Sequence, residues 1–215
     1  MSPTIETITF FFGKAICHQL PERSLTLNGH YLPLCARCTG IYIGIFCSLL
    51  FLLLTKKLHS NQIPTIKHSI YLLLFLLPLM IDGFGSYIGL FPTNNAIRIL
   101  TGILFGVTLP FFVVPLLSRS LQTDKRVITN IKHFIIPILI AFSLASITKQ
   151  ELISGHILAI VLIGAVIIWV TILFFLLYKR VQSNIITTGL SFASSLFTLT
   201  VFSLFHSFVN SIDVL

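Results

Sequence analysis

The sequence predicts an all-α, polytopic integral membrane protein with about six transmembrane helices. Of its 215 residues, 55% are hydrophobic and 9% are charged, whereas ordinary globular chains carry about 25% charged residues. The mean hydropathy is +0.99. A soluble domain needs more polar side chains to cover its surface, so the composition excludes a soluble enzyme and a disordered chain. The apolar runs are continuous and do not alternate, which argues against a membrane-spanning β-barrel.

Six apolar runs are close to the length of about 20 residues that a helix needs to cross the hydrocarbon core. The fourth run is the weakest, because Lys132 and His133 begin it and Pro137 interrupts it. We expect the spans at residues 34–54, 70–91, 96–117, 131–147, 152–178 and 185–209. Together they would form a six-helix transmembrane domain over residues 34–215.

Residues 1–33 precede the first span and differ from it in composition. Ile8–Phe12 is apolar but too short to span a bilayer. The segment has no basic n-region and no small-residue cleavage site, so it does not resemble a signal peptide. We predict a short interfacial or re-entrant segment that leads into a polar loop containing Asn28 and Gly29.

The distribution of Lys and Arg predicts the orientation, because basic loops stay cytoplasmic. Nine basic residues fall in the loops after the first, third and fifth spans: Lys56, Lys57, Lys67, Arg119, Lys125, Arg126, Lys132, Lys179 and Arg180. Five fall on the other side: Lys14, Arg23, Arg37, Arg98 and Lys149. We therefore expect a plasma-membrane protein with both termini exoplasmic. These scattered cations make up the net charge of +8, and those in the cytoplasmic loops would lie close to anionic lipid headgroups. We therefore expect the lipid bilayer as partner and no nucleic acid, because the cations do not gather into one patch.

The chemically versatile residues gather before and at the start of the first span. Cys17-His18 is followed by sixteen residues and then by Cys35-Ala36-Arg37-Cys38. A two-residue spacer lets both thiolates reach one ion at about 2.3 Å, and three Cys with one His form a common tetrahedral zinc set. The spacing therefore predicts an exoplasmic metal site, with Zn²⁺ as the expected ion and Cys17, His18, Cys35 and Cys38 as ligands.

Two other readings of the cysteines stay open. Cys35 and Cys38 would lie at a helix N-terminus, where the helix dipole and Arg37 favour the thiolates needed by a thiol–disulfide oxidoreductase. A relay needs a second pair, however, and beyond these two only Cys17 lies outside the spans, since Cys47 lies within the first one. The other reading is a structural disulfide or a set of inert thiols.

Asp82 is an acidic residue deep within a predicted span, about 13 Å from its end. An intramembrane carboxylate is costly unless it is paired, and we expect Arg98 as its partner across a short turn. The pair is either structural or lines the path of a small transporter. If the protein is an enzyme, which the sequence does not decide, Asp82, Arg98 and Glu22 are the candidate catalytic residues, with Glu151 as a further candidate base.

Glycines recur at a spacing that permits close contact between membrane helices. The three motifs are Gly40-x-x-x-Gly44, Gly85-x-x-x-Gly89 and Gly102-x-x-x-Gly106. The run Asp82-Gly83-Phe84-Gly85 could also break the helix around the carboxylate. These features suggest that the first three spans form a compact pocket at the outer face.

Two blocks of sequence carry a family resemblance. The first comprises Cys17-His18-Gln19, Pro21-Glu22-Arg23-Ser24, Gly29 and the run from Cys35 to Gly44, and the second comprises Asp82-Gly83, Asn94-Asn95, Arg98, Thr101 and Gly102. Over about residues 15–110 the chain resembles an uncharacterised bacterial membrane-protein family, the domain of unknown function number twenty eighty-five. The resemblance implies a membrane protein and no particular activity.

Overall fold

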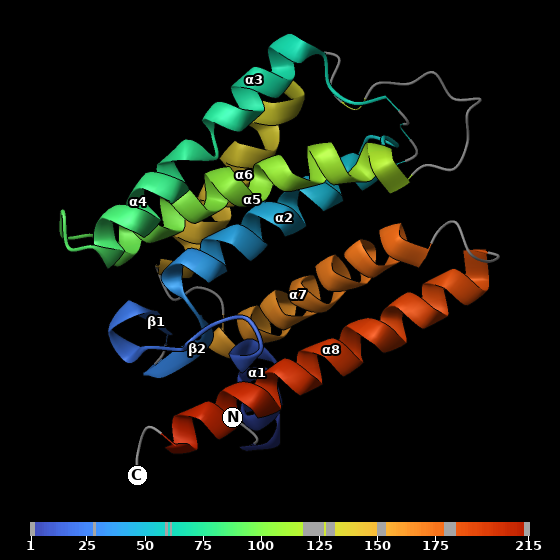
Figure 1. Ribbon diagram of the computed structural model, residues 1–215. Helices are drawn as coiled ribbons and strands as arrows, with labels where there is room; N and C mark the ends of the chain where they lie inside the picture. Colours follow the sequence, from blue (N-terminus) through green and yellow to red (C-terminus); the bar gives the residue numbers. More distant parts are fainter. Residues whose placement is uncertain are drawn as a thin grey trace. The chain divides into compact units, whose positions relative to one another are not determined.

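The computed structural model describes residues 3–27, 29–58, 60, 62–117, 127, 132–149, 154–178 and 184–212. The chain is predominantly helical, as the sequence predicted (Figure 1). Five helices of this part are long and apolar enough to cross a membrane: Ala36–Leu54, Ile66–Tyr87, Asn95–Leu117, Gly155–Tyr178 and Ile185–Ser211. The predicted fourth span corresponds to a shorter apolar helix, Lys132–Ile147.

The chain forms two compact units, of which the first combines Met1–Cys35 with Glu151–Leu215. α7 packs along α8, α1 contacts both of these helices, and β2 contacts α1 and α7 (Figure 1). Its elements are α1 (Pro3–Lys14), the 3₁₀ turn η1 (Pro21–Arg23), β1 (Ser24–Leu27), β2 (His30–Cys35), α7 (Gly155–Tyr178) and α8 (Asn184–Ile212).

Polar side chains hold the helices of the first unit together. The apolar run Ile8–Phe12 lies within α1, and the Ser203 hydroxyl of α8 donates a hydrogen bond to the Phe11 carbonyl at 2.7 Å. The hydroxyls of Thr171 in α7 and Ser195 in α8 are 2.9 Å apart. Hydroxyl groups that bond across helices are a common means of association where the surroundings are as apolar as the side chains.

Residues 24–35 form an antiparallel β-hairpin, where we expected a polar loop up to residue 33 and the start of the first span at residue 34. Leu27 pairs with His30, so Asn28 and Gly29 alone connect the two strands. Gly29 has a φ of 78°, which glycine adopts without a steric penalty. An Asn-Gly pair between strands is the strongest short signal for a two-residue hairpin. The sequence therefore contained the signal that the loop interpretation missed.

The second unit comprises Ala36–Gln150. α2 and α5 form its main contact and lie side by side in Figure 1, while α6 contacts both of them and α4 contacts α5. Its helices are α2 (Ala36–Leu54), α3 (Ile66–Leu74), α4 (Leu77–Tyr87), α5 (Asn95–Leu117) and α6 (Lys132–Lys149).

Glycines make the contact between α2 and α5 unusually close. A methyl group added at Gly44 would lie 2.7 Å from the Ile103 carbonyl oxygen, and one added at Gly40, Gly102 or Gly106 would also meet backbone of the other helix. Two of the three predicted glycine motifs therefore face each other. The third does not form such a contact, because Gly85 packs against the Phe91 ring.

The predicted second span is interrupted at a different place from the one we expected. α3 ends at Leu74 and α4 begins at Leu77, just before Pro78, whose ring prevents the hydrogen bond to the carbonyl four residues earlier. α4 then continues through Asp82 and Gly83 to Tyr87, so the expected break around the carboxylate is wrong. A single glycine costs a helix only about 1 kcal/mol, whereas proline costs about 3.

Some sequence-based expectations fall outside the described residues. The cations Arg119, Lys125, Arg126, Lys179 and Arg180, together with Glu151 and Asn28, lie there. The orientation that rests on these loops stays a prediction.

Candidate metal centre

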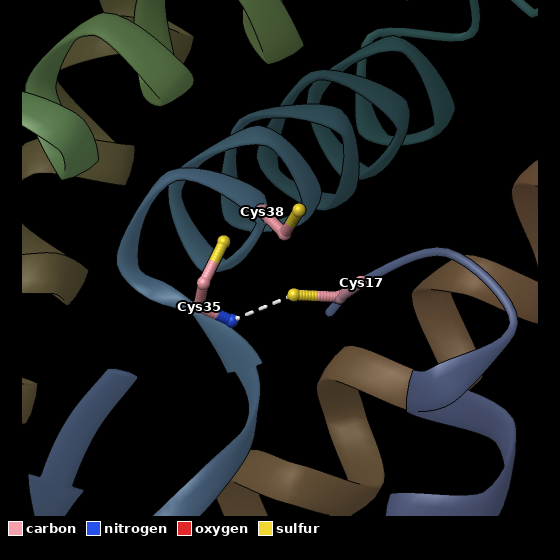
Figure 2. A group of neighbouring side chains, drawn as sticks. All are labelled: Cys17, Cys35 and Cys38. Atoms are coloured by element: carbon pink, nitrogen blue, oxygen red, sulfur yellow. Dashed lines mark hydrogen bonds between the residues drawn. The ribbon is translucent and has the colours of Figure 1, made fainter. Parts of the chain in front are cut away.

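Three of the four predicted metal ligands lie together (Figure 2). The sulfur atoms of Cys17, Cys35 and Cys38 are all within 4.8 Å of one another, and none of the three takes part in a disulfide. Cys17 is buried, whereas Cys35 and Cys38 are half-buried. We call this group the cysteine cluster.

A short network fixes Cys17 beside the end of β2. The backbone N–H of Cys35 donates a hydrogen bond to the Cys17 sulfur at 3.2 Å, drawn as the dashed line in Figure 2. The side-chain amide of Gln19 donates to the carbonyls of Phe10 and Pro33, at 2.9 Å each. These bonds tie α1 and β2 to the loop that carries Cys17, so the fold itself sets the position of the sulfur.

The other two thiols are placed by the junction between β2 and α2. Cys35 is the last residue of the strand, and Cys38 lies in the first turn of the helix that starts at Ala36. Sulfurs bound to one ion at about 2.3 Å each in a tetrahedral arrangement are about 3.8 Å apart. The sulfurs of the cluster would therefore have to approach one another by at most about 1 Å to hold a soft or borderline cation such as Zn²⁺.

His18, the fourth predicted ligand, does not join the cysteine cluster within the described residues. Its ring is exposed and lies edge-on to the ring of His206, with centroids 5.4 Å apart. The Nδ1 atom of His206 is buried and makes no hydrogen bond to the described residues. The role of His18 as a ligand stays a prediction.

The expected pairing of Asp82 with Arg98 is wrong. Asp82 in α4 is only 3% exposed and forms its ion pair with Arg37 of α2. Arg98 instead donates from Nη1 to the Asn95 side-chain oxygen of its own helix at 2.9 Å. The sequence placed Arg37 beside the thiols, and only the packing of α2 in the second unit reveals that its side chain is directed to Asp82.

The Asp82 carboxylate is well supplied with donors. Arg37 donates to Oδ2 from Nε at 3.0 Å and also from Nη2. The Thr93 hydroxyl donates to Oδ1 at 2.6 Å, and the Thr101 hydroxyl donates to Oδ2 at 3.4 Å. A buried charge with this many partners avoids most of the penalty for leaving water.

The catalytic role of Glu22, Asp82 and Arg98 stays a prediction. Glu22 lies in η1 and is exposed, Asp82 is occupied by its ion pair, and Glu151 lies outside the described residues. Among the described residues, the group that could hold a metal consists of cysteines and contains no carboxylate.

The fold and the cysteine cluster define a helical membrane protein with a potential metal centre at the start of a membrane-spanning helix. The family described as "Predicted membrane protein (DUF2085)" matches residues 17–112. That range contains the cysteine cluster, Arg37 and Asp82.

Two relatives support the same assignment. An uncharacterised protein of Methanocaldococcus jannaschii is 39% identical over 101 residues, which are 47% of this chain and 63% of the relative. An uncharacterised protein of Methanothermobacter thermautotrophicus is 39% identical over 99 residues, which are 45% of this chain and 82% of the relative. The chain belongs to the DUF2085 family of predicted membrane proteins.

The comparisons also limit what can be transferred. The match spans less than two thirds of the M. jannaschii protein. Both relatives are archaeal, so the expectation of a bacterial family is not confirmed. No solved structure matches the chain significantly.

Proposed function

We propose that this membrane protein binds a zinc ion through the thiolates of Cys17, Cys35 and Cys38, with His18 as the fourth ligand. The observation that carries the proposal is the mutual approach of the three sulfurs to within 4.8 Å. Cys35 and Cys38 lie at the junction between β2 and α2. Cys17 comes from a loop eighteen residues before Cys35, and a hydrogen bond ties its sulfur to the Cys35 backbone. Such convergence is what a tetrahedral thiolate site requires.

The donor set favours a structural centre over a hydrolytic one. A catalytic zinc keeps an open position and needs a base nearby, whereas a Cys₃His set closes the coordination shell. The cysteine cluster includes no carboxylate among the described residues that could serve as such a base. We therefore propose that the ion fixes the start of α2.

His18 is the best-placed fourth ligand because it directly follows Cys17 and is exposed. An exposed ring can turn away from His206 without emptying a packed core. We place the centre at the exoplasmic face of the plasma membrane, following the bias of Lys and Arg between the predicted loops.

Thiol–disulfide exchange is the second candidate, and it uses the same atoms. The third thiol, Cys17, lies near the Cys35–Cys38 pair and could act as a resolving thiol. The transporter alternative has less support, because Asp82 is already satisfied by Arg37 and two threonine hydroxyls.

Metal analysis of the full-length protein, purified in detergent without chelators, tests the proposal. We expect about one zinc per chain, and we expect Cys35→Ser/Cys38→Ser to lose it. Cys47→Ser is the matched control, because Cys47 is a buried thiol of α2 outside the cysteine cluster. Protein purified without zinc would contradict the proposal. A Cys35–Cys38 disulfide in that sample would favour thiol–disulfide exchange.

A further inference from the structure

We propose that the ion pair between Arg37 and Asp82 positions the metal-binding thiols, so that the affinity for zinc depends on a carboxylate of another helix. The inference rests on the proposed metal site and deepens it. Neither residue touches the ion in this proposal, so both are positioning residues.

The first observation is the place of Arg37 in the chain. It lies between Cys35 and Cys38, in the residues where β2 turns into α2. Because the peptide backbone is continuous through these four residues, any movement of Arg37 also moves the two thiols. A restraint on the Arg37 side chain therefore also restrains the segment that carries Cys35 and Cys38.

The second observation is the anchoring of this side chain on α4. Arg37 Nε donates to Asp82 Oδ2 at 3.0 Å, and Nη2 forms the ion pair with the same oxygen. Nη2 also lies 3.4 Å from both the Asp82 carbonyl oxygen and the Ser86 hydroxyl oxygen. A guanidinium is a planar fork, so several simultaneous bonds fix its orientation as well as its position.

The third observation is that residues in or just before α5 fix both the Asp82 carboxylate and the main chain of Arg37. Asp82 is buried and accepts hydrogen bonds from Thr93, which precedes α5, and from Thr101 within α5. The Arg37 main chain is fixed as well, because its carbonyl lies so close to Gly102 of α5 that a side chain there would collide with it. Both ends of Arg37 are thus held by neighbouring helices.

These contacts preorganise the thiols. Without the ion pair, the first turn of α2 loses its side-chain anchor, and ordering Cys35 and Cys38 becomes part of the cost of binding the ion. Groups that orient metal ligands without touching the metal typically change the affinity by about 10–100-fold when they are removed. We expect the lower part of that range, because Arg37 acts through the backbone.

The test compares Arg37→Gln and Asp82→Asn with a matched control, Arg98→Gln. Arg98 is a second cation of the same unit, but its guanidinium bonds to Asn95 and not to Asp82. Zinc affinity is measured on full-length protein in detergent by competition with a chromophoric chelator. Absorption of the cobalt-substituted protein reports the geometry of the thiolates.

We expect both variants to weaken zinc binding about tenfold or more and to change the cobalt spectrum. The double variant should be no weaker than the worse single variant, because the two residues act through one ion pair. Arg98→Gln should match the wild type. Arg37→Lys keeps the charge and should recover part of the loss.

Three results would count against these ideas in different ways. If the wild type binds zinc and the ion-pair variants bind it equally well with unchanged cobalt spectra, the inference is wrong and the metal site stands. If the wild type binds no zinc, the proposed function fails, and the inference fails with it. If Asp82→Asn does not fold, Thr93→Val removes a single bond to the carboxylate, and an unchanged affinity there together with full affinity in Arg37→Gln would overturn the inference.

Discussion

Replacing Gly44 with alanine tests whether the contact between α2 and α5 is as close as the structure indicates. The added methyl carbon would lie 2.7 Å from the Ile103 carbonyl oxygen and 2.8 Å from the Val107 nitrogen. Both atoms are backbone, so they cannot turn aside as a flexible side chain would. Ordinary contact begins at 3.4 Å, so the two helices would have to separate by about 0.7 Å at this level.

The expected cost follows from two opposing effects. Overpacking a well-filled interior costs about 1–3 kcal/mol, whereas exchanging glycine for alanine inside a helix gains about 0.5–1 kcal/mol. Gly164→Ala in α7 is the matched control, because a methyl group there meets nothing within 4 Å among the described residues. The gain is common to both variants, so their difference in unfolding free energy isolates the packing effect of about 1–3 kcal/mol.

Unfolding in mixed micelles with increasing denaturing detergent measures this difference for the two full-length variants. We expect Gly44→Ala to unfold at a lower detergent fraction than the wild type, and Gly164→Ala to unfold at the same or a higher fraction. Equal stability of the two variants would refute the close contact between α2 and α5.

Two further predictions concern the proposed metal centre. His18→Ala should weaken zinc binding by about tenfold or more, equivalent to 1.4 kcal/mol, whereas His30→Ala, whose ring also lies beside another histidine, should leave it unchanged; an equal effect of both would remove His18 from the ligand set. On whole cells, a membrane-impermeant thiol reagent should label the cysteine cluster after metal removal and reduction, and labelling only after lysis would reverse the predicted orientation.

The parts of the fold that depend on local composition could be predicted from the sequence. Long apolar runs of about 20 residues have few alternatives to a membrane helix, and the expected span 96–117 begins within one residue of α5. The grouping of Cys35 with Cys38 is likewise local, because only two residues separate them. Cys17 can meet these two thiols only if the chain between residues 17 and 35 folds back on itself, and the β-hairpin provides that reversal.

The partner of Asp82 could not be predicted in this way. Arg98 is the nearer cation in the sequence, yet it bonds within its own helix, while Arg37 reaches the carboxylate from forty-five residues away. The choice depends on how α2 packs beside α5 and α4, and two glycine motifs set the first of these contacts. Spacing identifies a small face on a helix, but it does not say which of several such faces meet.

One short segment satisfies three requirements at once. Cys35 and Cys38 supply thiols, Arg37 supplies the ion pair, and Gly40 begins the close contact with α5. Successive helical residues point about 100° apart, so thiols, guanidinium and glycine face different neighbours without competing for space. A change at any of these positions therefore acts on the segment that carries two thiols of the cysteine cluster.

The length of one relative indicates which part of the chain carries the cysteine cluster and the ion pair. The 99 aligned residues make up 82% of the M. thermautotrophicus protein, which is therefore about 120 residues long. A protein of that size has room for the region that the family match covers, residues 17–112, and for little more. That region holds the cysteine cluster, Arg37, Asp82 and both glycine motifs of the contact between α2 and α5. We therefore expect the proposed metal centre and its ion pair to belong to this shared region.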